Sequence, residues 1–496
     1  MRVLDISESV ETGQLGGFCP YWAQIGGEIV VADTAEEIIL ALPENKRIID
    51  PVAVLGLLQC NYMLGDRTLI EGIRRMPWHA ALRGDGIIER HPPLPHASRH
   101  VEPKEAAQAL RALLEEELYH VLKNCPRVFL LLSGGLDSRV VAGVLKRIEP
   151  QLPAQIACVT WGQQQSRDVA YARRIASWYD WQFFHIPYDV KLTWSNIVKG
   201  AIWGGSEIAG IHLHGVHWFE SAGPEDLVLA ASFGDSIGRA EFSGVRLSDL
   251  SLRAIRNTWG AIHPSLEREL IASAERDRQT AWQGDQRPPD WVKCELDMQE
   301  NYMRRMICHA LDYVRQFCKL HQAFTSDDVV SYMWSLSPSC RVDEIYHYLL
   351  KDLDHRLSAL PWARTGVAPD GSIEPDDALR KEYHEWGKWL RHDLRRRLEP
   401  LIFSPGLQQL GLFYGPAIRR MWAGFLAEPG DVLWTGENVV KLCSIELSRR
   451  HFKIGPCRTP TYWRDVISDA VRRGVQRARI LAWRAQRESE RFRRTC

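Results

Sequence analysis

One stretch constrains what this chain can fold into more than any other: LLLSGGLDSRVVAGVLK, at residues 130–146. It joins an apolar run of strand character, a Gly-rich turn SGGLDS and a helical pattern. Adjacent glycines let the backbone turn tightly with its N–H groups uncovered, and the following helix directs its positive dipole end at the same place. Such a corner suits an anion. Ser133 and Ser138 add hydroxyls for phosphate oxygens, whereas Asp137 would repel a bare phosphate unless a divalent cation lay between them. The stretch predicts a nucleotide bound with Mg²⁺.

The segments around this turn alternate between strands and helices. Helical patterns at 138–148 and 166–179 separate apolar runs that have the length of buried strands. Such alternation indicates βαβ units and therefore a parallel sheet with helices on its faces. Strands are expected at 127–132, 154–162, 182–187 and 225–232, with mostly helices after the last of them.

The pattern before residue 104 is different. Short apolar runs separated by Gly turns predict a small β-rich module with one helix near residues 50–64. The segment HPPLPHASRHVEP holds three prolines within five residues and has no periodicity, which marks a linker. We expect four parts: a β-rich module at 1–90, the linker at 91–103, an α/β unit at 104–400 and a helical, basic region at 401–496.

Composition excludes several classes of protein. The 496 residues include 62 Lys+Arg and 62 Asp+Glu, which argues against a protein held to nucleic acid by its overall charge. No apolar run approaches the roughly 18 residues of a membrane helix, and the N-terminus has no signal core. Eleven cysteines are scattered without a CxxC pair, so we expect reduced thiols in the cytoplasm and no structural zinc. The last 48 residues hold 14 Lys+Arg against 4 Asp+Glu, typical of a solvated helix or of contact with an anionic partner.

The turn SGGLDS resembles the pyrophosphate loop of the ATP pyrophosphatase superfamily, whose members split ATP into AMP and pyrophosphate to adenylate a substrate. Residues 48–90 look like the end of the glutaminase domain of asparagine synthetase and its relatives, and residues 321–366 look like that family's late helical segment. The resemblance implies an α/β fold with an adenine nucleotide α-hydrolase-like (HUP-type) parallel sheet. A degenerate glutaminase-like (Ntn-type) module would precede this sheet, and a helical region would follow it.

The same resemblance assigns nucleotide-binding residues. The loop would bind pyrophosphate through Ser133, Gly134, Gly135, Leu136, Asp137 and Ser138, and the next strand would carry the adenine against Val159, Thr160, Trp161 and Gly162, with Asp168 after it. The family's second phosphate segment, SGxGxDExxGG, is matched loosely by AASFGDSIGRAEFSG at 230–244, which places Ser232, Gly234, Asp235, Ser236 and Gly238 in it. Asp137 and Asp235 are the expected Mg²⁺ ligands. The usual Asp-Glu pair is missing, and Glu241 is displaced.

Members of this family also carry a lysine, in a K-x-x-L-R arrangement, that offsets the charge building on the α-phosphate. Alignment by eye puts His347 at that lysine and Lys351 at the arginine. Arg341 or Lys351 could substitute, although a solvated helix face explains Lys351 equally well. We expect the catalytic residues to be Asp137, Asp235, Arg341 and Lys351.

The N-terminal module lacks the family's nucleophile, a cysteine exposed when Met1 is removed. Here Arg2 follows Met1, and the first cysteine is Cys19. The module is also about half the expected length, so we expect a scaffold or substrate-binding remnant. Nitrogen would come from free ammonia, a separate amidase or pathway enzyme, or an amine on another substrate.

Three histidines, His212, His214 and His217, lie close together in IHLHGVHWFE. We interpret them, with Trp203 and the glycines after it, as the lining of a substrate pocket rather than a zinc site, because no Cys or acid stands at ligand spacing.

The sequence thus predicts an ATP- and Mg²⁺-dependent ligase that adenylates a small-molecule or peptide carboxylate and forms an amide with ammonia or an amine. A macrolactam cyclase of the lasso-peptide type and an amidating enzyme for surface polysaccharides are alternatives within the class. An inactive nucleotide-binding scaffold is the alternative from another class. We expect no nucleic acid partner and no transmembrane segment, and an oligomer is possible.

Overall fold

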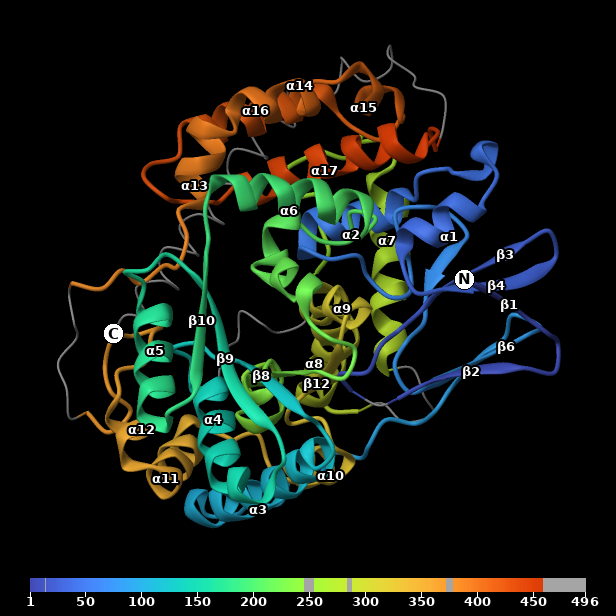
Figure 1. Ribbon diagram of the computed structural model, residues 1–496. Coiled ribbons are helices and arrows are strands. Elements are labelled where there is room, and N and C mark those ends of the chain that lie inside the picture. The colour runs from blue at the N-terminus through green and yellow to red at the C-terminus, as the bar shows by residue number, and fades with distance from the viewer. Residues whose placement is uncertain (14, 245–253, 283–287, 372–377, 458–496) are drawn as a thin grey trace.

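A five-stranded parallel sheet organises the middle of the chain (Figure 1). The computed structural model describes residues 1–457 except 14, 245–253, 283–287 and 372–377. The strand order is β10-β9-β8-β11-β12, with all neighbours parallel. The strands are β8 Arg127–Leu131, β9 Gln155–Gly162, β10 Gln182–Pro187, β11 Leu227–Ala230 and β12 Lys319–Gln322. The chain is therefore an α/β protein, as its alternating pattern predicts.

Helices cover both faces of this sheet because side chains along a buried strand alternate between them. Val128 and Leu130 of β8 belong to a core shared with α3 Pro103–Leu122, α4 Leu136–Ile148 and α11 Asp343–Leu353. Phe129, between them, belongs to the opposite core, shared with α6 Val190–Ile202 and α9 His309–Asp312. At the β10 edge, α5 Arg167–Tyr179 contacts β9 and β10.

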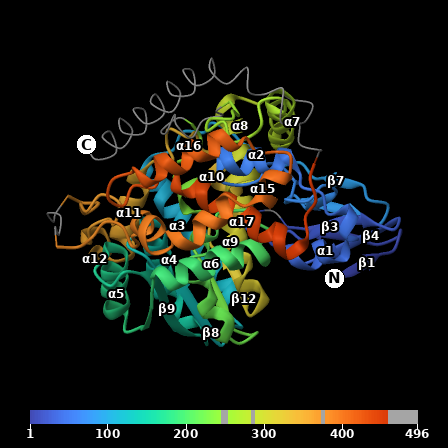
Figure 2. The ribbon, with the colours of Figure 1, turned by 90° about the horizontal axis from the view of Figure 1, so that it is seen from above.

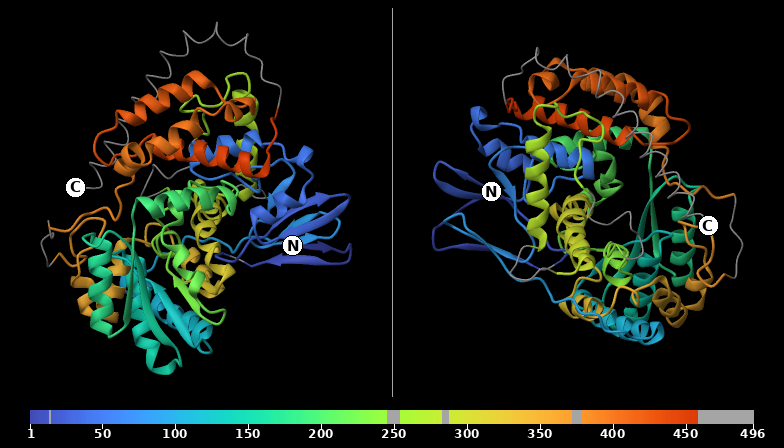
Figure 3. Two further views of the ribbon diagram at one scale, coloured as in Figure 1. Left: turned by 45° about the horizontal axis from the view of Figure 1, so that its top comes forward. Right: turned by 180° about the vertical axis from the view of Figure 1, so that it is seen from behind.

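The first ninety residues form two small antiparallel sheets, which lie to one side of the parallel sheet (Figure 3). Their strands are β1 Arg2–Leu4, β2 Ser9–Thr12, β3 Tyr21–Ile25, β4 Glu28–Ala32, β5 Ile73–Arg75, β6 Ala80–Arg83 and β7 Ile88–Arg90. The expected helix is α2, Pro51–Cys60. A second helix, α1 Ala35–Ala41, was not expected; it begins where the Thr34 side chain accepts a hydrogen bond from the Glu37 N–H.

The C-terminal helices pack over α6 and α2, on the side that faces the viewer in Figure 2. They are α13 Trp386–Lys388, α14 Arg395–Ile402, α15 Pro405–Gln409, α16 Gly415–Leu426 and α17 Gly436–Phe452. Of the other helices, α7 Glu267–Gln279 packs on α2, α10 Asp327–Ser335 packs on α3, and α12 His355–Ala359 packs on α11; α8 is Asp290–Asp297. One continuous core joins α2, the sheet face below α6, and α14 to α17. The basic end of the chain, from residue 458 on, lies outside the described residues.

One local expectation is corrected. The strand β12 was missed because it is short and polar, with the sequence KLHQ, and lies at the sheet edge. In the histidine segment, His212 lies in a 3-10 helix at Gly210–Leu213 and His217 in another at Val216–Ser221. Of the helices that the structure describes, none combines the length and the hydropathy needed to cross a bilayer.

Candidate active site

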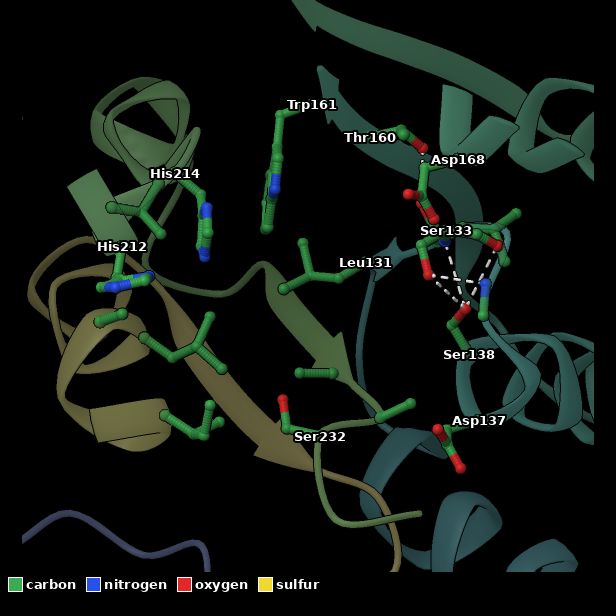
Figure 4. Close-up of a pocket in the computed structure, with 18 of the residues that line it drawn as sticks. Leu131, Ser133, Asp137, Ser138, Thr160, Trp161, Asp168, His212, His214 and Ser232 are labelled. Atoms are coloured by element: carbon green, nitrogen blue, oxygen red, sulfur yellow. Dashed lines mark hydrogen bonds between the residues drawn. The ribbon is translucent and has the colours of Figure 1, made fainter. Parts of the chain in front are cut away.

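A cavity of about 540 Å³ opens at the carboxyl ends of β8, β9 and β11. Open parallel sheets bind ligands at this edge, because loops and helix N-termini converge there. Figure 4 shows two unlike ends. The turn residues Ser133, Asp137 and Ser138 lie at one end, while His212 and His214 lie at the other. The volume falls within the roughly 300–1,000 Å³ range of small-molecule sites.

The turn at one end is held by its own hydroxyls. Ser138 Oγ accepts a hydrogen bond from the Ser133 N–H at 3.2 Å, and Ser133 Oγ accepts one from the Gly135 N–H at 3.1 Å. No side chain caps α4, so the first N–H groups of this 13-residue helix point at the cavity without a side-chain partner among the described residues. This end of the cavity can accept an anion.

Asp168 supports the turn from the first helical turn of α5. Its Oδ1 accepts a hydrogen bond from the Gly134 N–H at 3.0 Å, and the side chain lines the cavity. Burial raises the pKa of Asp168 to about 6, and the Gly134 hydrogen bond opposes that rise. Asp168 thus fixes the backbone of the turn and faces the space beside it.

The opposite side of the turn is anchored to the segment after α12. Arg139, which is fully buried, donates to the carbonyls of Gly134, Leu357, Leu360 and Pro361. The Ala363 N–H donates to the Gly134 carbonyl at 3.0 Å. A Cβ at Gly134 would stand 2.7 Å from that of Ala363, so only glycine fits.

Asp137 lies in the first turn of α4 and is paired with an arginine that we did not predict as a site residue. Arg239 Nη2 lies 3.1 Å from Asp137 Oδ2, and its Nη1 lies 2.9 Å from Asp343 Oδ1 on α11. The guanidinium is almost fully buried and stacks over the Tyr346 ring at 5.2 Å. The second phosphate segment forms a π-helical turn, Gly234–Gly238, and a Cβ at Gly234 would lie 2.5 Å from Asp137 Oδ1. The two predicted phosphate segments are therefore in direct contact.

Further carboxylates surround Arg239. Glu241 Oε2 lies 3.6 Å from Arg239 Nη2, and Glu241 Oε1 lies 2.8 Å from Arg364 Nη1. Burial, followed by the charges of Asp137 and Glu241, raises the pKa of Asp235 well above its usual range. Two buried oxygens have no hydrogen-bond partner among the described residues: Asp235 Oδ1 and Glu241 Oε2.

These orphaned oxygens bear on the predicted Mg²⁺. Within the described part of the chain, no three His, Cys, Asp or Glu side chains form a metal site by themselves. Mg²⁺ is commonly held by one or two carboxylates together with phosphate oxygens of a substrate. Asp137 and Asp235 fit that arrangement, because one borders the cavity and the other has an unpartnered oxygen beside it.

The other end of the cavity is aromatic. The rings of Trp161 and His214 are parallel within 5° with centroids 5.6 Å apart, and Trp386 also stacks on His214, with centroids 6.1 Å apart. The Tyr383 hydroxyl lies 3.3 Å from His214 Nδ1. Burial, with His212 and His384 nearby, lowers the pKa of His214 to about 3, so its imidazole is neutral at physiological pH. This end suits a planar, uncharged group.

The structure brings together most of the predicted nucleotide-binding residues. Those on the cavity wall are Ser133, Gly135, Asp137, Ser138, Val159, Thr160, Trp161 and Ser232. Gly134, Leu136, Gly162, Gly234, Asp235 and Ser236 belong to the same segments but are not on the wall itself. His212 and His214 line it, whereas His217 and Trp203 do not.

Two predicted catalytic residues lie elsewhere. Arg341 is fully buried, with its Nη2 2.7 Å from Glu295 Oε1, and it does not line the cavity. Lys351 is exposed on α11. The positive charges near the turn come instead from Arg239 and Arg364.

Arg239 stands inside the segment that we identified as the second phosphate motif, four residues after Asp235, and that position was the available signal. Arg364, Tyr383 and Trp386 belong to no motif, and only the fold brings them to the site.

One comparison with known proteins concerns the part of the chain that carries the SGGLDS turn. The asparagine synthase family model matches residues 109–207, which contain the turn, α4, α5 and three of the parallel strands. No curated protein matches the chain.

Three solved structures have low similarity to the chain, and none carries an argument about its reaction. The NH3-dependent NAD synthetase of Campylobacter jejuni is 14% identical, with 28% of this chain and 61% of that one covered and a TM-score of 0.18. The NMN synthetase of Francisella tularensis is 14% identical, with 29% of this chain and 60% of that one covered and a TM-score of 0.18. The U34-tRNA thiolase NcsA of Methanococcus maripaludis is 17% identical, with 43% of this chain and 77% of that one covered and a TM-score of 0.21. The chain thus spans about 60% of the length of the first two.

The family match and the cavity concern the same strands and the same turn. Within residues 109–207 the chain is therefore similar to the asparagine synthase family.

Proposed function

We propose that this protein is an ATP-dependent ligase that adenylates a carboxylate, releases pyrophosphate, and joins the activated acyl group to an amine or ammonia. The observation that carries the proposal is the single cavity described above. It places an uncapped helix N-terminus and the SGGLDS turn at one end and a stacked Trp161–His214 wall at the other. A nucleotide needs these two environments, one for its phosphates and one for its base.

The phosphate end would serve the adenylation step. A substrate carboxylate attacks the α-phosphate, and the bond to pyrophosphate breaks, so negative charge grows on the leaving group. Arg239 and Arg364, together with the N-terminus of α4, supply positive potential there. Asp137 and Asp235 would hold Mg²⁺, which when bound neutralises part of the same charge.

The aromatic end would protect the acyl-adenylate. Trp161, Trp386 and Tyr383 present mainly apolar surface, and His214 carries no charge at neutral pH. Such walls hold few waters, so hydrolysis of the mixed anhydride competes poorly with attack by the amine. The amine nitrogen forms the C–N bond, the bond between the acyl carbon and the phosphate oxygen of AMP breaks, and the nitrogen loses one proton.

The nitrogen would not come from glutamine hydrolysed by the first module. Cys19 is buried, and burial raises the pKa of its thiol to about 12. A thiol in this environment is neither accessible nor ionised at neutral pH, so it cannot act as a nucleophile. We therefore propose that residues 1–90 act as a scaffold for the unit at 104–400 and the helical region after it.

The test is pyrophosphate exchange and AMP formation with ATP, Mg²⁺ and a panel of carboxylates. Asp137→Asn should abolish both, since Asp137 lines the cavity next to Arg239. Asp328→Asn is the matched control, because Asp328 occupies the same position in the first turn of α10 but is exposed. Formation of ADP and phosphate in place of AMP would refute the mechanism.

A second candidate, a nucleotide-binding scaffold without activity, is favoured by one observation. Asp137 is already neutralised by Arg239, and the predicted Arg341 and Lys351 lie away from the cavity. The same assay separates the two functions: ATP binding without AMP formation for any carboxylate would establish the scaffold.

For substrate choice, a peptide and a surface sugar acid are the carboxylates to test first. We also propose a cytoplasmic location, which is supported by the free thiols of Cys125, Cys158 and Cys318.

A further inference from the structure

A second cavity, of about 310 Å³, shares Tyr302 with the first. Its wall is built from the end of α2 and the residues after it, from α7 and α8, and from the start of α17. Five aromatic side chains line it: Tyr62, Phe242, Trp259, Tyr302 and Trp434. Tyr302 packs against Tyr62 at 5.9 Å and against Phe242 at 5.4 Å between ring centroids. Nothing in the reaction proposed above uses this space.

The charged groups of this wall are unbalanced. Asp297 and Glu437 are acidic, whereas the only lining base among the described residues, Arg278, lies 2.5 Å from Glu275, which is not part of the wall. Asp297 is nearly fully buried, and its Oδ1 accepts a hydrogen bond from Asn301 Nδ2 at 2.8 Å. Burial raises the pKa of Asp297 to about 7, and the charge of Arg278 opposes that rise only in part. A bound cation would relieve that cost.

The two cavities meet at two points. Tyr302 lines both of them. Glu437 Oε1, on the second wall, lies 3.6 Å from Nε2 of His212, which lines the first. A group held in the second cavity is therefore next to the place where an acyl-adenylate would form.

Aromatic rings with buried carboxylates are the usual recognition elements for organic ammonium ions. The volume decides between ammonia and a larger amine. Ammonium is close in size to water, which takes about 30 Å³, so the cavity is about ten times too large for it. We propose that this second cavity binds the amine substrate as an organic ammonium ion, with Asp297 and Glu437 as counter-ions. The proposal rests on the proposed ligase function and names the class of its nucleophile.

The probe is benzylamine, a cation at pH 7.5, compared with benzyl alcohol of nearly the same shape and with ammonium chloride. Calorimetric titration of the full chain should show benzylamine binding at least tenfold more tightly than benzyl alcohol or ammonium. Asp297→Asn should weaken benzylamine binding at least tenfold, and Glu437→Gln provides a second variant. Asp290→Asn, at the exposed start of the same helix, is the matched control and should bind as wild type does.

Equal binding of benzylamine and benzyl alcohol to wild type overturns the proposal without any variant. Unchanged benzylamine binding in both Asp297→Asn and Glu437→Gln overturns it as well. If the wild type exchanges pyrophosphate but does not bind benzylamine, the amine-site proposal is refuted and the ligase proposal is not. Selective benzylamine binding without exchange for any carboxylate supports the amine site and counts against the ligase.

Discussion

Replacing Gly234 by alanine tests whether the contact between the two phosphate segments matters for adenylation. The added Cβ would stand 2.5 Å from Oδ1, 2.6 Å from Cβ and 2.8 Å from Cγ of Asp137. Carbon atoms pack at about 3.5–4.0 Å, so Asp137 or the turn carrying residue 234 must move by about 1 Å. The backbone of Gly234 is not in the left-handed region, so the effect comes from the contact alone.

A shift of this size acts on two measurable quantities. Overpacking of a buried contact costs about 1–3 kcal/mol, which urea unfolding would detect. A 1 Å displacement in a catalytic site costs about 100-fold in rate, and pyrophosphate exchange would measure that loss. The loss in exchange should exceed the loss of folded protein, because Asp137 is moved from Arg239 while the rest of the core is untouched.

Gly13→Ala is the control for this experiment. Apart from its chain neighbours, no heavy atom of the described residues lies within 4 Å of a Cβ built at Gly13, and its backbone also lies outside the left-handed region. It should leave exchange and unfolding as in wild type. If Gly234→Ala exchanges pyrophosphate within twofold of wild type, the position of the Asp137 carboxylate does not matter, and our account of the phosphate end is wrong.

Four further predictions concern single residues. Arg239→Met should lower the free energy of unfolding by about 3 kcal/mol, since it leaves buried carboxylates without their cation. Urea denaturation should show that the mutation lowers this free energy less at pH 5 than at pH 8. Equal decreases at the two pH values would contradict the prediction. The raised pKa of Asp168, about 6 against an ordinary 3.8, means that the folded state binds the proton more tightly, so stability falls as pH rises from about 4 to about 6. Asp168→Asn should then be more stable than wild type by about 3 kcal/mol above pH 6 and equal to it near pH 4. A constant difference across that range would refute the assignment. Trp161→Ala should raise KM for ATP by up to about tenfold, the stacking contribution of one ring, and an unchanged KM would place the base elsewhere. Lys351→Ala should leave exchange intact and unfolding within about 0.5 kcal/mol, since Lys351 is exposed, and loss of exchange would return it to the catalytic residues.

The sequence predicted the local elements at the centre of the site well. The run RVFLLL, the turn SGGLDS and the helix after it appear as β8, the turn and α4, and the next strand is β9. These features depend on neighbours along the chain, namely apolar periodicity, two glycines and a helix start, so their signal is contained in a few consecutive residues.

The cations of the site were predicted poorly for a physical reason. Arg341 was chosen because it stands near a family motif, but folding buries it against Glu295, away from the cavity. Arg239 and Arg364 take its expected place beside the turn because α11 and the segment after α12 pack on α4.

By itself, the sequence determined an α/β chain with a phosphate turn after its first parallel strand. Only the tertiary structure decided which charges surround Asp137, that His212 and His214 line the far end, and that a second cavity adjoins the first through Tyr302. The reason is that these groups come from distant segments, between residues 131 and 386 for the first cavity and between residues 58 and 438 for the second. No local pattern encodes their meeting, which follows from how helices bury their apolar faces on the sheet.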